Sequence, residues 1–407
     1  MSAEDGYAAM TPTCETPETA VPFQRARRCA VGLAVALAVA APVAVFRGGS
    51  TQQEQRSWAP ALAAATAPFR DTLGGPGSPL AKRVVVGMDT NVNFHIAWND
   101  WPAWSKEMSP YWTEDCIYDF NYVGVWGFGP THGLRGWYEG EHLHFNAAIP
   151  DCQWLDFIRA ATDTTATSAS YGLARWMSPF AGVPPPPEQP RVRIRDLDFY
   201  LLRGDRIHIN WCIIDVVDLF QQVGYAVLPP APMATLGYRA PSAMDGFPAP
   251  LSSMFTPEDA AASERVWRAA LKEDYDEGSP EARQWAEDII WYGPGGVGTA
   301  LTRRDYAAHF LRPLHAAFAD VVRETDLVVC EGPYCGAHFY LYGTHVGEWL
   351  GEKPTGRRVP IRCGAHARIA DGKIVEGWLI IDVPKAFHAM GVDLYARARA
   401  IAMGSSA

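Results

Sequence analysis

The feature of this sequence that most constrains its fold is an internal repeat. Three pairs of segments share a pattern: Trp112-Thr-Glu114-Asp115 with Trp285-Ala-Glu287-Asp288, Asn146–Asp151 with His315–Asp320, and Asn210–Asp215 with Gly377–Asp382. The pairs occur in the same order and at a nearly constant offset along the chain, which chance rarely produces. We therefore interpret the chain as a tandem duplication of a unit of ~130 residues.

Composition and proline content set the boundaries of the repeated units. Two blocks rich in Trp and Tyr, residues 90–225 and 255–395, are separated by a proline-rich linker at 226–254. Because 48% of the 407 residues are hydrophobic, each block can bury a core of its own. Residues 1–89 are interpreted as a targeting or anchor segment with a disordered spacer, and residues 396–407 as a C-terminal tail.

The N-terminal segment contains an apolar run, residues 29–46, that follows Arg25, Arg27 and Arg28. The run is slightly shorter than the ~20 residues that cross a bilayer, and longer than the about 7–15 apolar residues of a secretion signal. Spanning and cleavage are both compatible with this length. We interpret the run as a membrane anchor or targeting segment rather than a disordered tail, and expect the protein to be otherwise cytoplasmic.

Charge and cysteine spacing argue against two classes of function. The net charge of −10, without a basic stripe interleaved with aromatic residues, disfavours nucleic-acid binding. The eight cysteines show neither a CxxC pair nor the Cys/His spacing of a zinc site, so we expect no metal. Cys330 and Cys335 can pair in an oxidising compartment, but we expect them to be buried thiols like the others.

The second block has the pattern of helices followed by strands. Thr256-Pro257-Glu258-Asp259 predicts the start of a helix that runs to about Glu273, and a second helix is predicted from Arg303 to Phe318. Strands are predicted at 327–330, 337–346, 358–369 and 373–383. This order predicts an α+β fold in each unit, with N-terminal helices packed on a curved antiparallel sheet.

The motifs of this block resemble a known family. They are Gly343-Thr344-His345-Val346-Gly347, Pro354-Thr355-Gly356-Arg357-Arg358, and Asp371–Trp378 followed by Asp382. Together they resemble the SnoaL-like polyketide cyclases of the NTF2-like superfamily, strongly over residues 255–395 and through the repeat over 90–225. The resemblance implies two tandem NTF2-like cone domains, of which the first is degenerate.

The resemblance also implies a function and a set of partners. Enzymes of this family close a polyketide ring by intramolecular aldol condensation, without metal or coenzyme. We therefore expect a cofactor-independent cyclase, isomerase or lyase that binds a small hydrophobic keto compound. Because NTF2-like sheets commonly dimerise through their exposed faces, we also expect an intrachain pseudo-dimer that can form a homodimer.

Asp382 matches the aspartate that acts as acid and base in the family. Trp378 and Ile380 precede it on the same face of an apolar strand, so its carboxyl group should lose hydration. Loss of hydration raises a carboxyl pKa toward the value that a base needs near neutral pH. The resemblance thus assigns the catalytic role to Asp382.

His366 is the second catalytic candidate, and its facing depends on the hairpin register. If Ala370-Asp371-Gly372 forms a type I turn with a glycine bulge, His366 shares the face of Asp382 with Arg362. If Asp371-Gly372 forms a two-residue turn, His366 points away. We expect the bulged turn, because the resemblance suggests a histidine in the pocket.

Further residues are expected around the substrate. His345 is a third catalytic candidate, although its flanking glycines equally suit a histidine that pins a bend in the sheet. The residues expected to contact the substrate are Trp378, Tyr342, Trp285 and Arg362. Aromatic side chains would stack on flat rings there, but core packing accounts for them as well.

The first block departs from the family pattern. Gly172-Leu173-Ala174 stands in place of the Gly-Thr-His motif, and only Asp215 is retained, with Trp211 on the same strand. A second active site at Asp215 and Trp211 is one alternative. We favour a half that is structural or binds a different ligand. His142 and His144 have the wrong spacing for a helical metal pair and are interpreted as a solvated helix face.

Two hypotheses about function follow. In the first, the protein is a cofactor-free cyclase, isomerase or dehydratase, with Asp382 as the base and His366 assisting. In the second, it is a non-catalytic NTF2-like pair that binds a ligand or a partner, and the buried aspartate is only a hydrogen-bonded structural residue.

Overall fold

The computed structural model describes residues 78–92, 99–122, 124, 127–245, 255–279 and 281–404, all within one compact unit. The apolar run that was interpreted as an anchor or targeting segment, 29–46, lies outside the described residues. In the described part of the chain, no helix has the length and apolar character that a membrane span requires.

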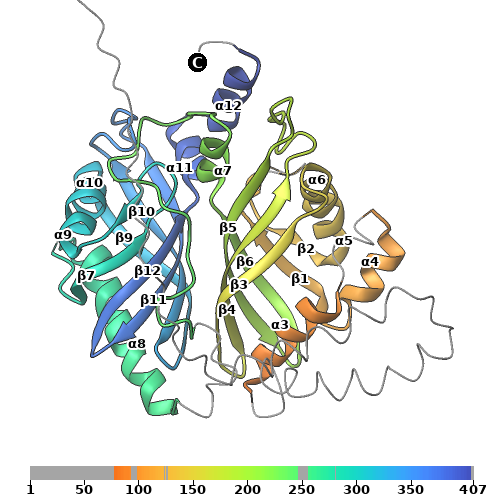
Figure 1. The fold of residues 1–407 in the computed structure, drawn as a ribbon, viewed down its shortest axis with the longest axis horizontal. Helices are drawn as coiled ribbons and strands as arrows, with labels where there is room; N and C mark the ends of the chain where they lie inside the picture. Colours follow the sequence, from red (N-terminus) through yellow and green to blue (C-terminus); the bar gives the residue numbers. More distant parts are fainter. Residues whose placement is uncertain are drawn as a thin grey trace, which may run out of the picture. The chain divides into compact units, whose positions relative to one another are not determined.

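The first half of the described chain is a six-stranded sheet with helices on one side (Figure 1). Its strands are β1 (Trp112–Phe120), β2 (Thr131–His132), β3 (Gln153–Ala161), β4 (Thr165–Arg175), β5 (Arg191–Arg203) and β6 (Arg206–Ile214). Its helical segments are α3 (Leu80–Asn91), α4 (Trp101–Met108), α5 (Gly133–Trp137), the π-helical η1 (Tyr138–His142), α6 (Leu143–Ala148) and α7 (Val216–Gln222). The strand order is β2-β1-β6-β5-β4-β3.

The second half repeats this arrangement. Its strands are β7 (Trp285–Tyr292), β8 (Thr299–Ala300), β9 (Phe318–Glu331), β10 (Tyr334–His345), β11 (Arg358–Ala370) and β12 (Lys373–Ile381), in the order β8-β7-β12-β11-β10-β9. Its helical segments are α8 (Pro257–Leu271), η2 (Lys272–Asp276), α9 (Arg303–Tyr306), η3 (Ala307–Leu311), α10 (Arg312–Ala317), α11 (Val383–Met390) and α12 (Leu394–Ala402). The matching strand orders are consistent with a tandem duplication, and the predicted α+β fold class is confirmed.

The helices of the second half follow the predicted pattern. Thr256 is the N-cap of α8: its hydroxyl accepts a hydrogen bond from the Asp259 N–H, and the Asp259 carboxylate accepts one from the Thr256 N–H. The helix ends at Leu271 and continues as a π-helical turn to Asp276. The helix predicted over 303–318 is present as α9, η3 and α10.

Two features of the sheets differ from the prediction. Each sheet contains one parallel pair, β1 with β6 and β7 with β12, among otherwise antiparallel neighbours. In addition, β9 begins at Phe318, well before the predicted start at residue 327. This strand lies at the edge of its sheet and is half-exposed. Its first part therefore contains many polar residues and lacks the apolar pattern by which a strand is predicted.

The β11–β12 hairpin decides which residues share a face. Asp371 and Gly372 both have positive φ, 50° and 71°, which makes a two-residue turn rather than the expected bulged one. An extra residue shortly after the turn shifts the register by one. As a result His366 lies opposite Trp378. His366 therefore lies on the same face of the sheet as Asp382, as expected. The bulge that causes this lies within the strand pair and not in the turn, where it was predicted.

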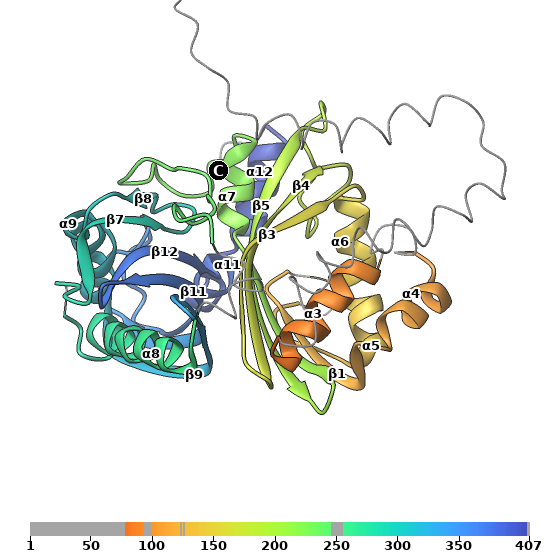
Figure 2. The same ribbon diagram turned by 60° about the horizontal axis from the view of Figure 1, so that its bottom comes forward.

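Helices α7, α11 and α12 lie at one end between the sheets, whereas the other helices cover one face of each sheet, and the remaining faces of the two sheets pack against each other (Figure 1 and Figure 2). Gly364 permits the close approach, because a Cβ there would lie 2.7 Å from Cγ2 of Ile213. Buried residues from both halves form this contact, among them Leu197, Phe199, Ile213, Trp378 and Ile380.

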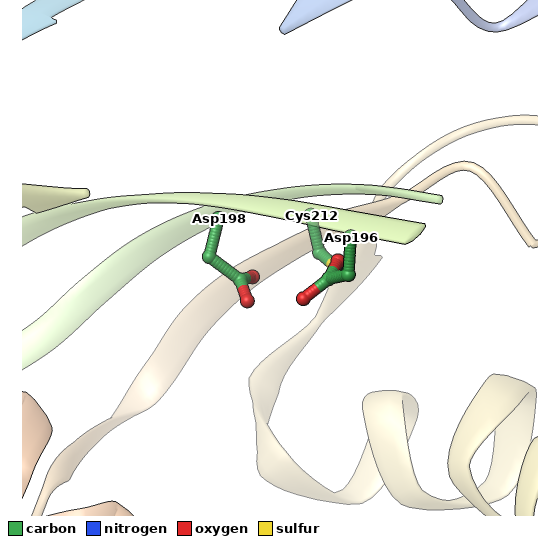
Figure 3. Close-up of side chains that lie close together, drawn as sticks. All are labelled: Asp196, Asp198 and Cys212. Carbon is green, nitrogen blue, oxygen red and sulfur yellow. The ribbon is translucent and has the colours of Figure 1, made fainter. Parts of the chain in front are cut away.

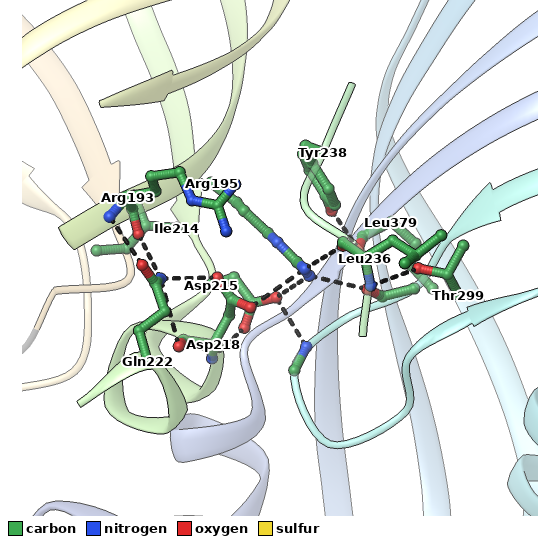
Figure 4. A network of polar contacts seen from close by, with 12 residues as sticks. Arg193, Arg195, Ile214, Asp215, Asp218, Gln222, Leu236, Tyr238, Thr299 and Leu379 are labelled. Atoms are coloured by element: carbon green, nitrogen blue, oxygen red, sulfur yellow. Dashed lines mark hydrogen bonds and ion pairs between the residues drawn. The ribbon is translucent and has the colours of Figure 1, made fainter. Parts of the chain in front are cut away.

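A buried arginine of the first half adds polar contacts to this apolar layer (Figure 4). Arg195 of β5 donates to the backbone oxygens of Gly293, at 3.1 Å, and of Leu236, at 2.8 Å. It also forms ion pairs with Asp215, at 3.2 Å, and Asp218, at 3.1 Å. Its charge is therefore compensated at the place where the halves meet.

The proline-rich segment after the first half is described to residue 245 and lies along the second half. The Tyr238 hydroxyl donates to the backbone oxygen of Leu379, at 2.6 Å, and Trp378 Nε1 donates to the backbone oxygen of Arg239, at 3.1 Å. Tyr238 is buried. This part of the segment is therefore packed and hydrogen-bonded to the strand β12.

Two cysteines differ from the expectation of buried thiols. Cys330 and Cys335 form a disulfide, because the β9–β10 hairpin sets them directly opposite each other. Beside them, Glu331 forms an ion pair of 2.6 Å with the fully buried Lys82 of α3, so the hairpin also contacts the first half. The other described cysteines are buried thiols as expected: Cys116, Cys152, Cys212 and Cys363.

Candidate active site

Asp382, the predicted base, is fully buried at the end of β12 and caps α11. Its Oδ1 accepts a hydrogen bond of 3.1 Å from the backbone N–H of Lys385. Burial raises the pKa of Asp382 to about 6, and the charges of Arg362 and Lys385 act in the opposite direction. Asp382 lines neither the large cavity of the first half nor the small one of the second.

His366 and Trp378 lie in the contact between the two sheets. The Nε2 atom of His366 lies 2.7 Å from Oγ1 of Thr167 in the first half, and its ring stacks on Phe199. Burial lowers the pKa of His366 to about 3, so its ring is neutral near pH 7. These contacts join the halves.

Arg362 of β11 is also fully buried in this contact. It forms an ion pair of 3.1 Å with Asp119 and donates to the backbone oxygens of Asp119, at 2.6 Å, and Cys212, at 3.3 Å. Its Nε also donates to Nε2 of His338, at 2.9 Å, which requires a neutral His338 ring. Burial lowers the pKa of His338 to about 4, in agreement with that role.

His345 and Tyr342 make their contacts within the second half. The Nδ1 atom of His345 lies 3.2 Å from Oγ1 of Thr355 and accepts a hydrogen bond of 3.3 Å from the Thr355 N–H, and its ring stacks on Phe318. These contacts pin the turn after β10. The half-buried Tyr342 stacks on Tyr340.

The first-half candidates Asp215 and Trp211 also belong to the sheet contact. Asp215 caps α7 by accepting from the Asp218 N–H, at 3.0 Å, and it accepts from the Gly295 N–H of the second half, at 2.7 Å. The half-buried Trp211 stacks on His338. Neither residue lines the large cavity of its own half.

The interpretation of His142 and His144 as a solvated helix face is wrong for His142. His144 is exposed, but His142 is 5% exposed within the π-helical turn η1. Its Nδ1 lies 3.1 Å from Nδ2 of Asn146, and its ring centroid lies 4.8 Å from that of Trp104. The helix α4, which no periodicity in this short segment predicted, covers that face.

The cone of the second half is filled by aromatic side chains. Its residual cavity is about 10 Å³, too small for a substrate. A buried carboxylate lies there: Asp274 accepts from Trp285 Nε1, at 3.0 Å, and from the Tyr306 hydroxyl, at 3.1 Å. Burial raises the pKa of Asp274 to about 7. Trp285, predicted to contact substrate, is thus a partner of this closed site.

The cone of the first half, by contrast, contains a cavity of about 750 Å³. This volume lies within the ~300–1,000 Å³ typical of sites for small molecules. Strands β1, β3, β4, β5 and β6 form one wall, and α3 with the α5–η1–α6 segment forms the other. The lining includes five carboxyl side chains: Asp89, Glu141, Asp156, Asp196 and Asp198.

Two of these carboxyl groups form a pair on β5. Asp196 and Asp198 are two residues apart on one strand, so their side chains point the same way, together with Cys212 of the neighbouring strand (Figure 3). The Ser170 hydroxyl donates to Asp196 Oδ2, at 2.9 Å, and Asn210 Nδ2 donates to Asp198 Oδ1, at 3.0 Å. No ion pair holds either carboxyl group within the described part of the chain.

The environment separates the roles of the two carboxyl groups. Burial, reinforced by the charge of Asp198, raises the pKa of Asp196 well above its usual range. Burial also raises the pKa of Asp198, but the hydrogen bonds from Asp196 and Asn210 favour its ionised form. Two carboxyl groups of this kind titrate as a pair, and these hydrogen bonds favour a shared proton on Asp196 over Asp198.

The same groups have the composition of a metal site. One ligand atom each from Asp196, Asp198 and Cys212 lies within 4.8 Å of the others. Two carboxylates and a thiolate suit a borderline-soft divalent ion such as Zn²⁺. Because burial raises the pKa of Cys212 well above its usual range, that thiol is protonated unless a cation is bound.

Glu141 contributes to the cavity a third carboxyl group without an ion pair in the described chain, from η1, and the charge of Arg362 acts on it only to lower its pKa. It is 2% exposed, and its Oε2 has no hydrogen-bond partner among the described residues. Burial, reinforced by the charge of Asp119, raises the pKa of Glu141 to about 9. Glu141 is therefore protonated at neutral pH in the free protein.

The Glu141→Gln variant should change the pH dependence of stability. Between the ordinary glutamate pKa and about 9, the folded protein retains a proton that the unfolded chain releases, so the free energy of unfolding falls as pH rises. Removing this group should flatten the fall, so that the variant gains stability over the native protein progressively from pH 5 to pH 9. Thermal unfolding across this range measures the difference. A constant difference at all pH values would contradict the assignment.

Comparison of the two halves shows why only the first cone has a carboxyl pair on its sheet. The two sheets can be aligned residue by residue, because β6 and β12 end at matching positions of the repeat. In this alignment of the partner strands β5 and β11, Cys363 occupies the position of Asp196, and Ala365 occupies that of Asp198. The second half therefore has no carboxyl pair at this position, and its cavity is filled.

One signal in the sequence points to this site. Asp196 and Asp198 are separated by one residue within a strand-forming segment, so both must face one side of the sheet. Two carboxyl side chains on one face are unusual for a buried strand, unless they lie at a sheet edge or next to a turn. Glu141 gave no comparable signal, because its burial depends on the π-helical turn.

Comparisons with known proteins agree with the motifs of the second half. Residues 265–389 match the model of the SnoaL-like polyketide cyclase family. No curated protein matches the sequence significantly.

Several solved structures are similar to part of the chain. Wild-type IdmH from Streptomyces antibioticus shares 25% identity over 32% of this chain and 99% of its own, with a TM-score of 0.28. A SnoaL-like protein from Jannaschia sp. CCS1 shares 18% over 34% and 96%, with a TM-score of 0.30. An LEH-like epoxide hydrolase from M. tuberculosis shares 16% over 37% and 100%, with a TM-score of 0.27. The family match therefore places the similarity to the SnoaL-like polyketide cyclases in residues 265–389, within the second half of the chain.

Proposed function

We propose that the protein is a cofactor-independent acid–base enzyme, of the cyclase or isomerase type, whose active site is the cavity of the first half. Its substrate would be a small, largely apolar keto compound. The observation that carries the proposal is the carboxyl pair of the buried Asp196 and the half-buried Asp198, which lines a cavity of substrate size and has no cationic partner among the described residues.

The pair has the groups that enolisation requires. Asp198, ionised and oriented by Asn210, would take a proton from the carbon next to a carbonyl group. Asp196, which holds a proton, would donate to the carbonyl oxygen as negative charge develops there. The resulting enol is protonated at another carbon in an isomerisation, or attacks a second carbonyl of the same molecule in an aldol closure.

The lining of the cavity supports an apolar frame for the substrate. Aromatic side chains face it from both walls, including Trp112, Tyr118 and Phe120 of β1 and Trp137 and Phe145 of the helical wall. Flat rings stack on such residues, which also exclude water from the reacting atoms. The second half would then support this cavity through the packed sheets.

Deuterium exchange tests the proposal without knowledge of the natural substrate. Aromatic ketones such as 2-tetralone are incubated with the protein in D₂O, and loss of the α-proton signal is followed by NMR. We expect protein-dependent exchange that is lost in Asp196→Asn. The matched control is Asp205→Asn, an exposed residue in the β5–β6 turn, which should exchange at the native rate.

Two outcomes would contradict the proposal. One is the absence of exchange above the buffer rate for every ketone tested, which would favour a non-catalytic ligand-binding protein. The other is exchange that disappears with EDTA and returns with a divalent cation, which would assign the cluster of Asp196, Asp198 and Cys212 to a metal.

A further inference from the structure

Glu141 is the one buried carboxyl group of the cavity that the proposed proton transfers do not use. It lies on the helical wall, whereas the pair that is proposed to react lies on the sheet. Its Oε2 is buried and lacks a hydrogen-bond partner among the described residues, although the side chain lines the cavity. A buried polar atom without a partner is costly, so an unfilled acceptor in a cavity points to a ligand that donates to it.

The surroundings of Glu141 indicate the charge of that donor. Trp137 and Phe145 flank it one turn away on either side, and both line the cavity. Tyr118 stacks on Trp137, with ring centroids 4.0 Å apart. A carboxyl group among aromatic faces is the environment that binds organic ammonium groups, by charge and by cation–π attraction.

The charge balance of the whole cavity favours the same ligand. Five carboxyl side chains line it, and none of the described residues that line it is a lysine or an arginine. Asp89 and Asp156 share one cation, Arg159, which forms ion pairs with both and offsets one of their two charges. Glu141 and the pair on β5 have no such partner in the described chain. An anionic ligand would therefore be repelled, and a cationic one would be attracted.

We propose that the cavity of the first half binds a compound that carries a basic amine on an aromatic or otherwise apolar frame, with the ammonium group against Glu141. This inference names the substrate class of the proposed active site and rests on that cavity. The amine would lie on the helical wall, so the carboxyl pair on the sheet is left to act on the rest of the molecule.

Binding of three matched probes tests the inference. The probes are 2-naphthylmethylamine, 2-naphthylmethanol and 2-naphthoate, which differ only in the polar group. Isothermal titration at pH 7 should show the amine binding about 10- to 100-fold more tightly than the alcohol, with the naphthoate weakest. Because Glu141 is protonated in the free protein, amine binding should also release close to one proton, which the buffer dependence of the enthalpy measures.

Two variants locate the ammonium group. Glu141→Gln should remove both the advantage of the amine and the proton release, while leaving the affinity for the alcohol unchanged, which also shows that the cavity is intact. Glu139→Gln is the matched control, because Glu139 lies on the same helical segment but is exposed. It should bind all three probes as the native protein does.

Three results would overturn the inference. The alcohol binds as tightly as the amine, the preference for the amine survives Glu141→Gln, or the preference is lost in Asp198→Asn while Glu141→Gln keeps it. None of these results bears on α-proton exchange with neutral ketones. A failure of the amine inference is therefore distinct from a failure of the proposed enzymatic function.

Discussion

Asp198→Asn is expected to lower the rate of α-proton exchange by about 10²–10⁴-fold, because an amide cannot accept the proton that the carboxylate takes. The shape of the side chain and its contact with Asn210 are kept, and no ion pair is lost. Exchange rates at saturating ketone measure the effect.

The pH profile of the native enzyme checks the same assignment. The rate should fall at low pH, where Asp198 becomes protonated, and at high pH, where Asp196 loses its proton. A bell-shaped profile is therefore expected. In Asp198→Asn the residual rate should lack the fall at low pH.

Asp382→Asn is the decisive comparison, because the family resemblance assigns catalysis to that position. Asparagine caps a helix as well as aspartate does, so α11 should keep its start. Since Asp382 does not line the cavity, its variant should exchange at the native rate. If Asp382→Asn abolished exchange and Asp198→Asn did not, the active site would lie in the second half.

Arg362→Leu is expected to lower the free energy of unfolding by about 3–5 kcal/mol, the usual cost of breaking a buried ion pair. The substitution would leave the Asp119 carboxylate and two strand carbonyls without their donor. Denaturant unfolding at pH 7 measures the change. Because Arg362 also donates to the backbone of the cavity residue Cys212, ligand binding should weaken as well.

Two further variants separate the ion pair from general damage. Arg358→Leu removes an exposed arginine of the same strand and should cost about 0–1 kcal/mol. Combining Arg362→Leu with Asp119→Asn should recover part of the loss, since the second change removes the unpaired charge. If Arg362→Leu cost no more than Arg358→Leu, the buried contact would contribute nothing to the folded protein.

Local patterns were enough to predict the α+β class and the helices of the second half. The capping sequence at Thr256 and the helical stripe over 303–318 are local signals, and both helices are present. The β11–β12 hairpin was visible in Asp371-Gly372, but its register was not. A bulge within β12 brought His366 to the face of Asp382, and nothing in the sequence marks the position of that bulge.

The candidate site was harder to predict, because a strand has two faces and the sequence does not say which one meets a cavity. Asp382 and His366 do share a face, and His366 on that face contacts Thr167 of the other half, whereas Asp382 lines no cavity. The cysteine pair shows the same limit. Cys330 and Cys335 become neighbours only because a hairpin sets them opposite each other.

Repeats, caps and turn motifs are written in consecutive residues, so they were enough to predict the repeated pattern, the α+β class and the resemblance of the second block to the SnoaL-like polyketide cyclases, whose family model matches residues 265–389. Which cone is open, and which carboxyl groups face it, became visible only in the folded structure. The physical reason is the volume of the side chains inside each cone. Trp285, Tyr306 and their neighbours fill the cone of the second half. In the open cone of the first half, Asp196 and Asp198 occupy positions at which the second half has a cysteine and an alanine. The matching positions of the two halves can be compared only after strands that are distant in the sequence have been paired.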